Sequence, residues 1–216
     1  MSTNDNGLVK NPIVWIDCEM TGLDPSVDEL VEIAVIVTDS DLNPLAEGID
    51  LVIKPSAAAL AQMGEFVTQM HTDSGLIHEF GSGVSLEDAT RIVLDYIAGL
   101  VPQSGVAPVA GNSIGQDVRF LRAYMPEVVD YLHYRIIDVS TIKELAKRWY
   151  PRVYVCAPEK TGGHRALGDI QDSIVELQYY RTALFPEDLI AEKGAYHRIA
   201  NEVAESAQAA FQAVAE

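Results

Sequence analysis

Five short apolar stretches divide the chain, and polar turns separate the first three. Short apolar runs bounded by turn residues are typical of buried strands. Because short turns join the first three, these runs indicate an antiparallel meander. The predicted strands cover residues 13–16, 30–38, 49–53, 108–112 and 136–139.

A helical period replaces this pattern after the third stretch. Ser85 is a suitable cap for the first helix, Pro126 would end the second, and residues 151–164 look irregular. Helices that alternate with the last two strands predict an α/β protein, with a mixed five-stranded sheet flanked by helices. The predicted helices cover residues 86–100, 116–125, about 141–149, 166–184 and an alanine-rich tail from 195 to 216.

The composition fits one globular domain, which we predict over residues 12–185, between a polar tail of residues 1–11 and a helical extension of residues 186–216. The chain has 216 residues, of which 48% are hydrophobic and 22% charged, so it can bury a substantial core. No apolar run approaches the ~20 residues of a membrane span, and the first residues lack the apolar core of a signal peptide. Its two cysteines, Cys18 and Cys156, form no disulfide framework. We therefore expect a cytoplasmic protein that does not bind membranes.

The charge balance restricts the class of partner. Lys and Arg number 15 and Asp and Glu 32, which gives a net charge of −17. Proteins that bind long nucleic acids without sequence preference neutralise phosphates with Lys and Arg, so this charge argues against a long nucleic-acid groove. A short nucleic acid, or one held through metal ions, stays compatible with it.

Two acids follow the first apolar stretch directly. Asp17 and Glu19 leave the same face of a strand, while Cys18 points to the other. Neighbouring carboxylates repel each other unless a positive group lies between them, and Mg²⁺ prefers oxygen ligands. Taken alone, the pair also fits an ordinary strand end that enters a polar turn. A zinc site is not expected, because Cys18 faces away and no Cys/His pair has zinc spacing.

Three more polar residues stand where elements meet. Asp117 opens a predicted helix, His164 follows two glycines, and Asp169 lies in the first turns of the next helix. Each has an ordinary interpretation, as a helix-dipole partner, a solvated histidine or a charged helix face. Together with Asp17 and Glu19 they match the residues of a two-metal phosphodiester hydrolase. A histidine of pKa ~6.5 would accept the proton of the attacking water.

The order of these residues resembles the DEDDh 3′→5′ exonucleases, and within them the oligoribonuclease family. The resemblance spans about residues 12–185 and implies a ribonuclease H-like fold. It also implies a homodimer that uses two divalent cations, Mg²⁺ or Mn²⁺. The motifs that carry it are Trp15-Ile16-Asp17-Cys18-Glu19-Met20-Thr21-Gly22-Leu23-Asp24-Pro25, Gly111-Asn112-Ser113-Ile114-Gly115-Gln116-Asp117, and His133-Tyr134-Arg135 leading to Asp138-Val139-Ser140-Thr141.

The resemblance implies an activity and assigns residue roles. The substrate would be single-stranded RNA of about two to five nucleotides, dinucleotides especially, cut to mononucleotides at the end of RNA degradation. Leu23 and Phe66 would wedge and stack two bases, although the family has Trp at the second position. The metal ligands would be Asp17, Glu19, Asp117 and Asp169, the general base His164, the phosphate-binding residues His71, Ser113 and Ser140, and the residues from the other subunit Tyr134 and Arg135.

Two alternatives compete with this hypothesis. Another DEDDh exonuclease could proofread DNA or trim tRNA, but the motifs of residues 111–117 and 133–135 argue against it. A non-catalytic RNA-binding or scaffolding module would have no use for four clustered carboxylates. Nuclease activity with and without a chelator distinguishes such a module from a metal-dependent nuclease. The acids themselves favour neither Mg²⁺ nor Mn²⁺.

Overall fold

The computed structural model describes residues 9–161, 163–185, 196, 199–201 and 203–204. The chain divides into two compact units, Met1–Tyr180 and Arg181–Glu216. Most of the predicted polar tail and of the predicted tail helix lies outside the described residues, and the domain boundaries stay a prediction. In the part of the chain that is described, no helix combines the length and apolar character needed to cross a membrane.

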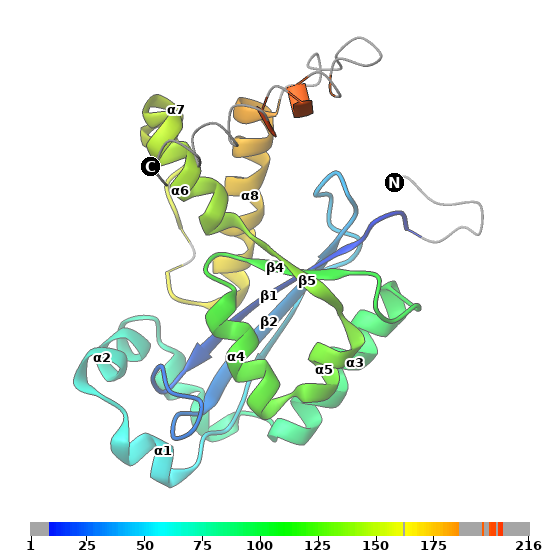
Figure 1. Cartoon of the computed structure of the whole chain (residues 1–216). Helices are drawn as coiled ribbons and strands as arrows, with labels where there is room; N and C mark the ends of the chain where they lie inside the picture. Colours follow the sequence, from blue (N-terminus) through cyan, green and yellow to red (C-terminus); the bar gives the residue numbers. More distant parts are fainter. Residues whose placement is uncertain (1–8, 162, 186–195, 197–198, 202, 205–216) are drawn as a thin grey trace, which may run out of the picture. The chain divides into compact units, whose positions relative to one another are not determined.

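The first unit is built on a mixed five-stranded sheet (Figure 1). The order across the sheet is β3-β2-β1-β4-β5. β1, β2 and β3 pair antiparallel, whereas β4 pairs parallel with β1 and with β5. This confirms the predicted mixed sheet with its meander first. The strands are β1 (Ile13–Met20), β2 (Leu30–Thr38), β3 (Ile49–Val52), β4 (Pro108–Gly111) and β5 (His133–Asp138).

The four main helices agree with the prediction within two residues, and α3 and α8 agree at both ends. Short helices at residues 57–82 were not predicted. α4 ends before Pro126 as predicted, although Pro126 then begins α5, which was not predicted. The prediction that residues 151–164 are irregular was wrong at its start, because Pro151 begins α7 and proline suits the first turn of a helix. The helices are α1 (Ala57–Gln62), α2 (Glu65–Asp73), η1 (Leu76–His78), η2 (Phe80–Ser82), α3 (Leu86–Leu100), α4 (Gly115–Tyr124), α5 (Pro126–Tyr131), α6 (Val139–Trp149), α7 (Pro151–Val155) and α8 (Ala166–Leu184).

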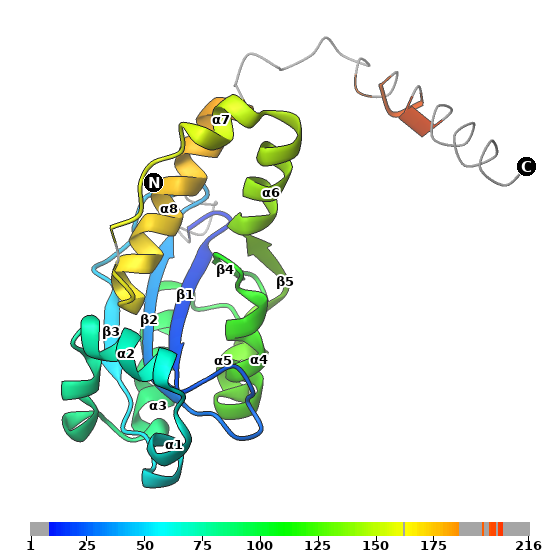
Figure 2. The same cartoon turned by 90° about the vertical axis from the view of Figure 1, so that its left-hand side faces the viewer.

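The two faces of β1 pack against different helices. Ile16 and Cys18 belong to the apolar cluster that α3, α4 and α5 complete, whereas Trp15 packs with Ile170 of α8 on the other face. Figure 2 shows α8 running along the sheet on that second face. Cys18 therefore faces away from its two acidic neighbours, as predicted, and these acids lie on the α8 face of the sheet.

Candidate active site

The carboxyl end of β1 carries the first two acids inside the strand, since β1 continues to Met20 instead of ending at Ile16 as predicted. Asp17 and Glu19 alternate with Cys18, so both carboxylates leave the same face. Together with Asp117 and Asp169, they form what we call the acid cluster. Its members come from β1, α4 and α8, so the tertiary fold rather than local sequence brings them together.

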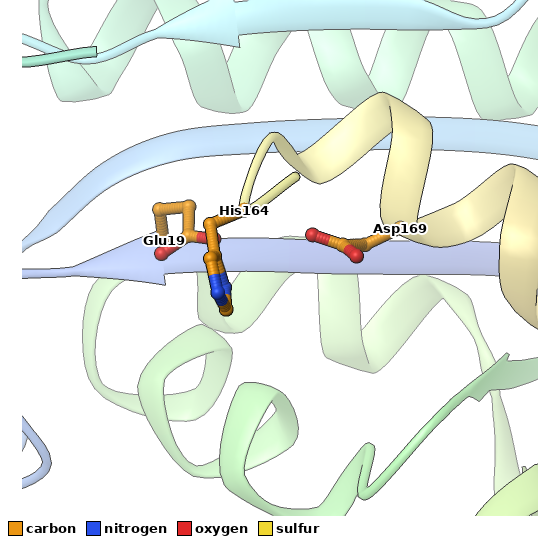
Figure 3. A group of neighbouring side chains, drawn as sticks. All are labelled: Glu19, His164 and Asp169. Carbon is orange, nitrogen blue, oxygen red and sulfur yellow. The ribbon is translucent and has the colours of Figure 1, made fainter. Parts of the chain in front are cut away.

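His164 and Asp169 enter from the loop before α8 and from its first turn (Figure 3). Ligand atoms of Glu19, His164 and Asp169 all lie within 4.8 Å of one another. This spacing is short enough for one metal ion to contact several of them. The structure thus brings together three of the predicted site residues in a single group.

Asp117 is fixed to the strand by a hydrogen bond. The backbone N–H of Cys18 donates to Asp117 Oδ1 at 3.0 Å, between the two acids of β1. Asp117 lies in the first turn of α4 and only 6% of it is exposed. The bond aligns the beginning of α4 with the end of β1, so the third carboxylate has a defined position beside the first two.

Among the described residues, Lys160 and Arg165 offset the charges of the acid cluster only in part. Burial, followed by the neighbouring carboxylates, raises the pKa of Asp17 to about 9. Burial, followed by Glu32 and the other acids, raises the pKa of Glu19 to about 8. Burial also raises the pKa of Asp117 to about 7, and it raises the pKa of Asp169. Carboxylates that hold protons near neutral pH would release them to a divalent cation, so this set of hard oxygen donors fits Mg²⁺ or Mn²⁺.

His71 borders the acid cluster from α2 and is fully buried. Its Nε2 lies 2.9 Å from the carbonyl oxygen of Met20, which can only accept, so Nε2 carries the proton. Nδ1 lies 4.0 Å from Glu19 Oε2 and has no hydrogen-bond partner among the described residues. Burial lowers the pKa of His71 and favours the neutral ring. Its predicted contact with a phosphate stays a prediction.

The two residues predicted to hold the bases are both exposed. Leu23 lies in the turn after β1 with 74% exposure, and Phe66 lies on α2 with 81%. Gln116 of α4 donates from Nε2 to the carbonyl oxygen of Leu23 at 2.8 Å. The turn that carries Leu23 is therefore tied to the helix that carries Asp117.

Asp138 brings Ser113 and Ser140 together. Asp138 Oδ1 accepts from the backbone N–H of Ser113 at 3.0 Å, and from the N–H and Oγ of Ser140 at 2.9 and 2.6 Å. It is also the N-cap of α6. Ser113 and Ser140, two of the three residues predicted to bind phosphate, are therefore held by the same carboxylate.

Tyr134 and Arg135 lie apart from this arrangement on β5, an edge strand separated from β1 by β4. Tyr134 is 79% exposed, and its ring stacks on that of His133 at 4.4 Å between centroids. Arg135 Nε donates to the Tyr134 hydroxyl at 3.2 Å. No described contact links either side chain to the acid cluster of the same chain.

Sequence reasoning missed two residues beside the loop that carries His164. Arg165 follows His164 directly, and its Nε donates to Glu32 Oε1 at 2.7 Å. Glu32 is fully buried in β2. A lone acid within an otherwise apolar strand was the available signal, because a buried carboxylate needs a partner.

Comparison with known proteins defines the class. The exonuclease family model RNase T matches residues 14–177. Exonuclease I of E. coli, in its zinc-bound complex with single-stranded DNA, aligns with a TM-score of 0.63 and 14% identity, over 82% of this chain and 42% of that one. Exonuclease I from Methylocaldum szegediense aligns with a TM-score of 0.58 and 19% identity, over 81% and 41%. The chain spans about two fifths of these longer proteins, so the likeness shows the fold. Fold and family model together define an exonuclease.

Curated relatives specify the family within this class. An oligoribonuclease from Leifsonia xyli subsp. xyli is 59% identical over 182 residues, which cover 84% of this chain and 86% of the relative. One from Streptomyces griseus is 57% identical over 173 residues, covering 80% and 86%. The chain belongs to the oligoribonuclease family of metal-dependent 3′→5′ exonucleases.

Proposed function

We propose that this protein hydrolyses short oligoribonucleotides, dinucleotides above all, from the 3′ end to mononucleotides and so completes RNA degradation. The observation that carries the proposal is the group formed by Glu19, His164 and Asp169, whose ligand atoms lie within 4.8 Å of one another beside the rest of the acid cluster. The names of the oligoribonuclease relatives support the choice of RNA.

The acid cluster would hold two divalent cations, Mg²⁺ or Mn²⁺. Bound ions of this kind, ~3.5–4 Å apart, stabilise the attacking and leaving oxygens of a phosphodiester. His164 is exposed and carried on a loop, so its ring can take the proton from the attacking water.

Leu23 and Phe66 would hold the bases of the substrate. Both are large apolar side chains with most of their surface exposed, and base stacking tolerates any base identity. A phenyl ring offers less stacking surface than the indole that the family has at this position. Ser113, Ser140 and His71 would contact phosphates, the two serines from the anchor that Asp138 provides.

We further propose a homodimer in which Tyr134 and Arg135 reach the partner's active site. The support is their exposure on an edge strand and their distance from the acid cluster of their own chain. An exposed edge strand presents unpaired backbone groups and is a frequent surface for association.

The net charge of −17 is compatible with this substrate. A dinucleotide carries few phosphates, and Arg135 with the cations can balance them. Long RNA would pass over an acidic surface and be repelled. A cytoplasmic location is part of the proposal, supported by the two free cysteines, Cys18 and Cys156.

A time course tests the activity. RNAs of two to ten nucleotides, labelled at the 5′ end, are incubated with the protein and Mg²⁺, with and without a chelator. We expect shortening from the 3′ end, complete conversion of the dinucleotide, and no reaction with the chelator. Internal cleavage, or equal activity with the chelator, would contradict the proposal.

A further inference from the structure

Glu32 lies directly opposite Glu19 in the pairing of β1 with β2. Like charges in such cross-strand positions destabilise a sheet. Glu32 is fully buried, so water cannot screen it. A buried acid beside a member of the acid cluster therefore requires a specific partner.

The partner comes from the two residues that follow His164. Glu32 Oε1 accepts from Arg165 Nε at 2.7 Å, and Glu32 Oε2 accepts from the backbone N–H of Ala166 at 2.9 Å. Ala166 is the first residue of α8, where backbone N–H groups lack partners within the helix. One carboxylate thus fixes both the loop that carries His164 and the start of the helix that carries Asp169.

Arg165 extends these contacts to another part of the chain. Its two terminal nitrogens donate to the carboxylate of Glu79, between η1 and η2, at 2.8 and 3.4 Å. Its carbonyl oxygen accepts from the N–H of Asp169 at 3.0 Å. Asp50 of β3 adds a weaker ion pair at 4.0 Å. Arg165 therefore joins the His164 loop to three separate elements.

The loop itself has a conformation that needs such support. His164 has φ of 60° and Gly163 has φ of 66°. The left-handed region is unfavourable for a residue with a Cβ, and it persists where surrounding contacts fix the backbone. The contacts of Arg165 and Ala166 begin at the very next residue.

We propose that Arg165 and Glu32 are positioning residues for the reaction, which hold His164 in place over the acid cluster. Neither side chain needs to touch substrate, because Arg165 is bound to Glu32 and Glu79. The inference rests on the proposed function, in which His164 is the general base. It predicts that removing Arg165 matters for turnover only while His164 is present.

A double-mutant cycle tests this dependence. Arg165→Ala should lower kcat on a dinucleotide by about 10–100-fold, the effect of a misplaced catalytic group, with little change in KM. In the His164→Ala background the same change should lower kcat by less than about twofold, because the group being positioned is already absent. Effects that multiply would overturn the proposal. Arg91→Ala is the matched control, since Arg91 is exposed and its ion pairs with described residues are local ones, with Asp88 and Asp95 on α3.

Hydrogen exchange gives a readout that does not need activity. Amides of residues 163–168 should exchange about tenfold faster in Arg165→Ala than in the wild type, while those of β1 stay unchanged. Unchanged exchange in this segment would overturn the proposal even if the protein proves inactive on RNA, an outcome that would refute the proposed function separately. Arg165→Lys keeps one charged donor and should fall between wild type and Arg165→Ala. If Arg165→Ala does not fold, the double-mutant cycle with His164→Ala is measured with Arg165→Lys instead.

Discussion

The acid cluster and the edge strand β5 are supported in opposite ways. The cluster is largely buried and its members are fixed by contacts within the chain, such as the bond from Cys18 to Asp117. On β5, Tyr134 and Arg135 are exposed and contact each other. The difference fits the proposal that one chain contains the groups for the chemistry, whereas Tyr134 and Arg135 act in a partner's site.

We expect the largest loss of activity when one carboxylate of the acid cluster is removed. Asp117→Asn keeps an acceptor for the N–H of Cys18 but loses the carboxylate. We expect kcat to fall at least about 10³-fold, the result of losing roughly 4 kcal/mol of transition-state stabilisation. The metal-free thermal midpoint should hold or rise, because repulsion in the cluster is relieved. Normal turnover by Asp117→Asn would remove Asp117 from the site.

His164 is the exposed residue of this region. His164→Ala should lower kcat by about 10²–10⁴-fold, the usual contribution of a general base. The affinity for Mn²⁺, measured by calorimetry, should change little. Since His164 also lies within 4.8 Å of two acids, a collapse of Mn²⁺ binding would instead identify it as a metal ligand.

The proposed role of Arg135 on the exposed strand β5 can be tested by mixing subunits. Arg135→Ala should lower kcat/KM by about 10–150-fold, which corresponds to a charged hydrogen bond worth about 1.5–3 kcal/mol. An equal mixture of Arg135→Ala and Asp117→Asn subunits should regain about a quarter of wild-type activity, because one site of each heterodimer keeps both residues. No recovery after confirmed subunit exchange would place Arg135 outside the partner's site.

The smallest effect concerns stability of the metal-free protein. The pKa values of Asp17, Glu19 and Asp117 are about 9, 8 and 7 in the folded chain, against about 4 when unfolded. The folded chain therefore binds more protons between these values, and the free energy of unfolding decreases as pH rises from about 4 through 7–9. The thermal midpoint should therefore fall steadily as the pH rises from 5 to 9.

Two further measurements test this prediction about the thermal midpoint. Saturating Mg²⁺ should remove most of the fall, since it binds the ionised, folded form. Asp117→Asn should show a shallower fall than the wild type. A midpoint that is independent of pH in all three samples would mean that the acids are not coupled as the structure places them.

The parts of the fold that local pattern determines were predictable. The helix at residues 166–184 was predicted at both ends because its apolar residues face the sheet at helical spacing. The alternation of β1 placed Asp17 and Glu19 on one face. The short helices at residues 57–82 were missed because they present no long apolar stripe. Pro126 and Pro151 were interpreted as breaks, although proline also starts helices.

The support around the site could not be predicted in the same way. The bond from Cys18 to Asp117 joins residues 99 positions apart, and that from Arg165 to Glu32 joins residues 133 positions apart. Such contacts follow from how elements pack, which no local spacing reveals. The four acids of the cluster were found through a motif, whereas Arg165 and Glu32 belonged to no motif and became visible in the tertiary structure.

Dependence of rate on RNA length tests the central claim most directly, because it involves both regions at once. Initial rates are measured on 5′-phosphorylated RNAs of two to ten nucleotides, for wild type and Arg135→Ala. If the buried acids cut a substrate that Arg135 and the phosphate-binding serines confine, kcat/KM is highest for the dinucleotide and falls with length. Arg135→Ala should flatten this dependence. Equal wild-type rates from two to ten nucleotides would contradict the account and indicate an exonuclease without a length limit.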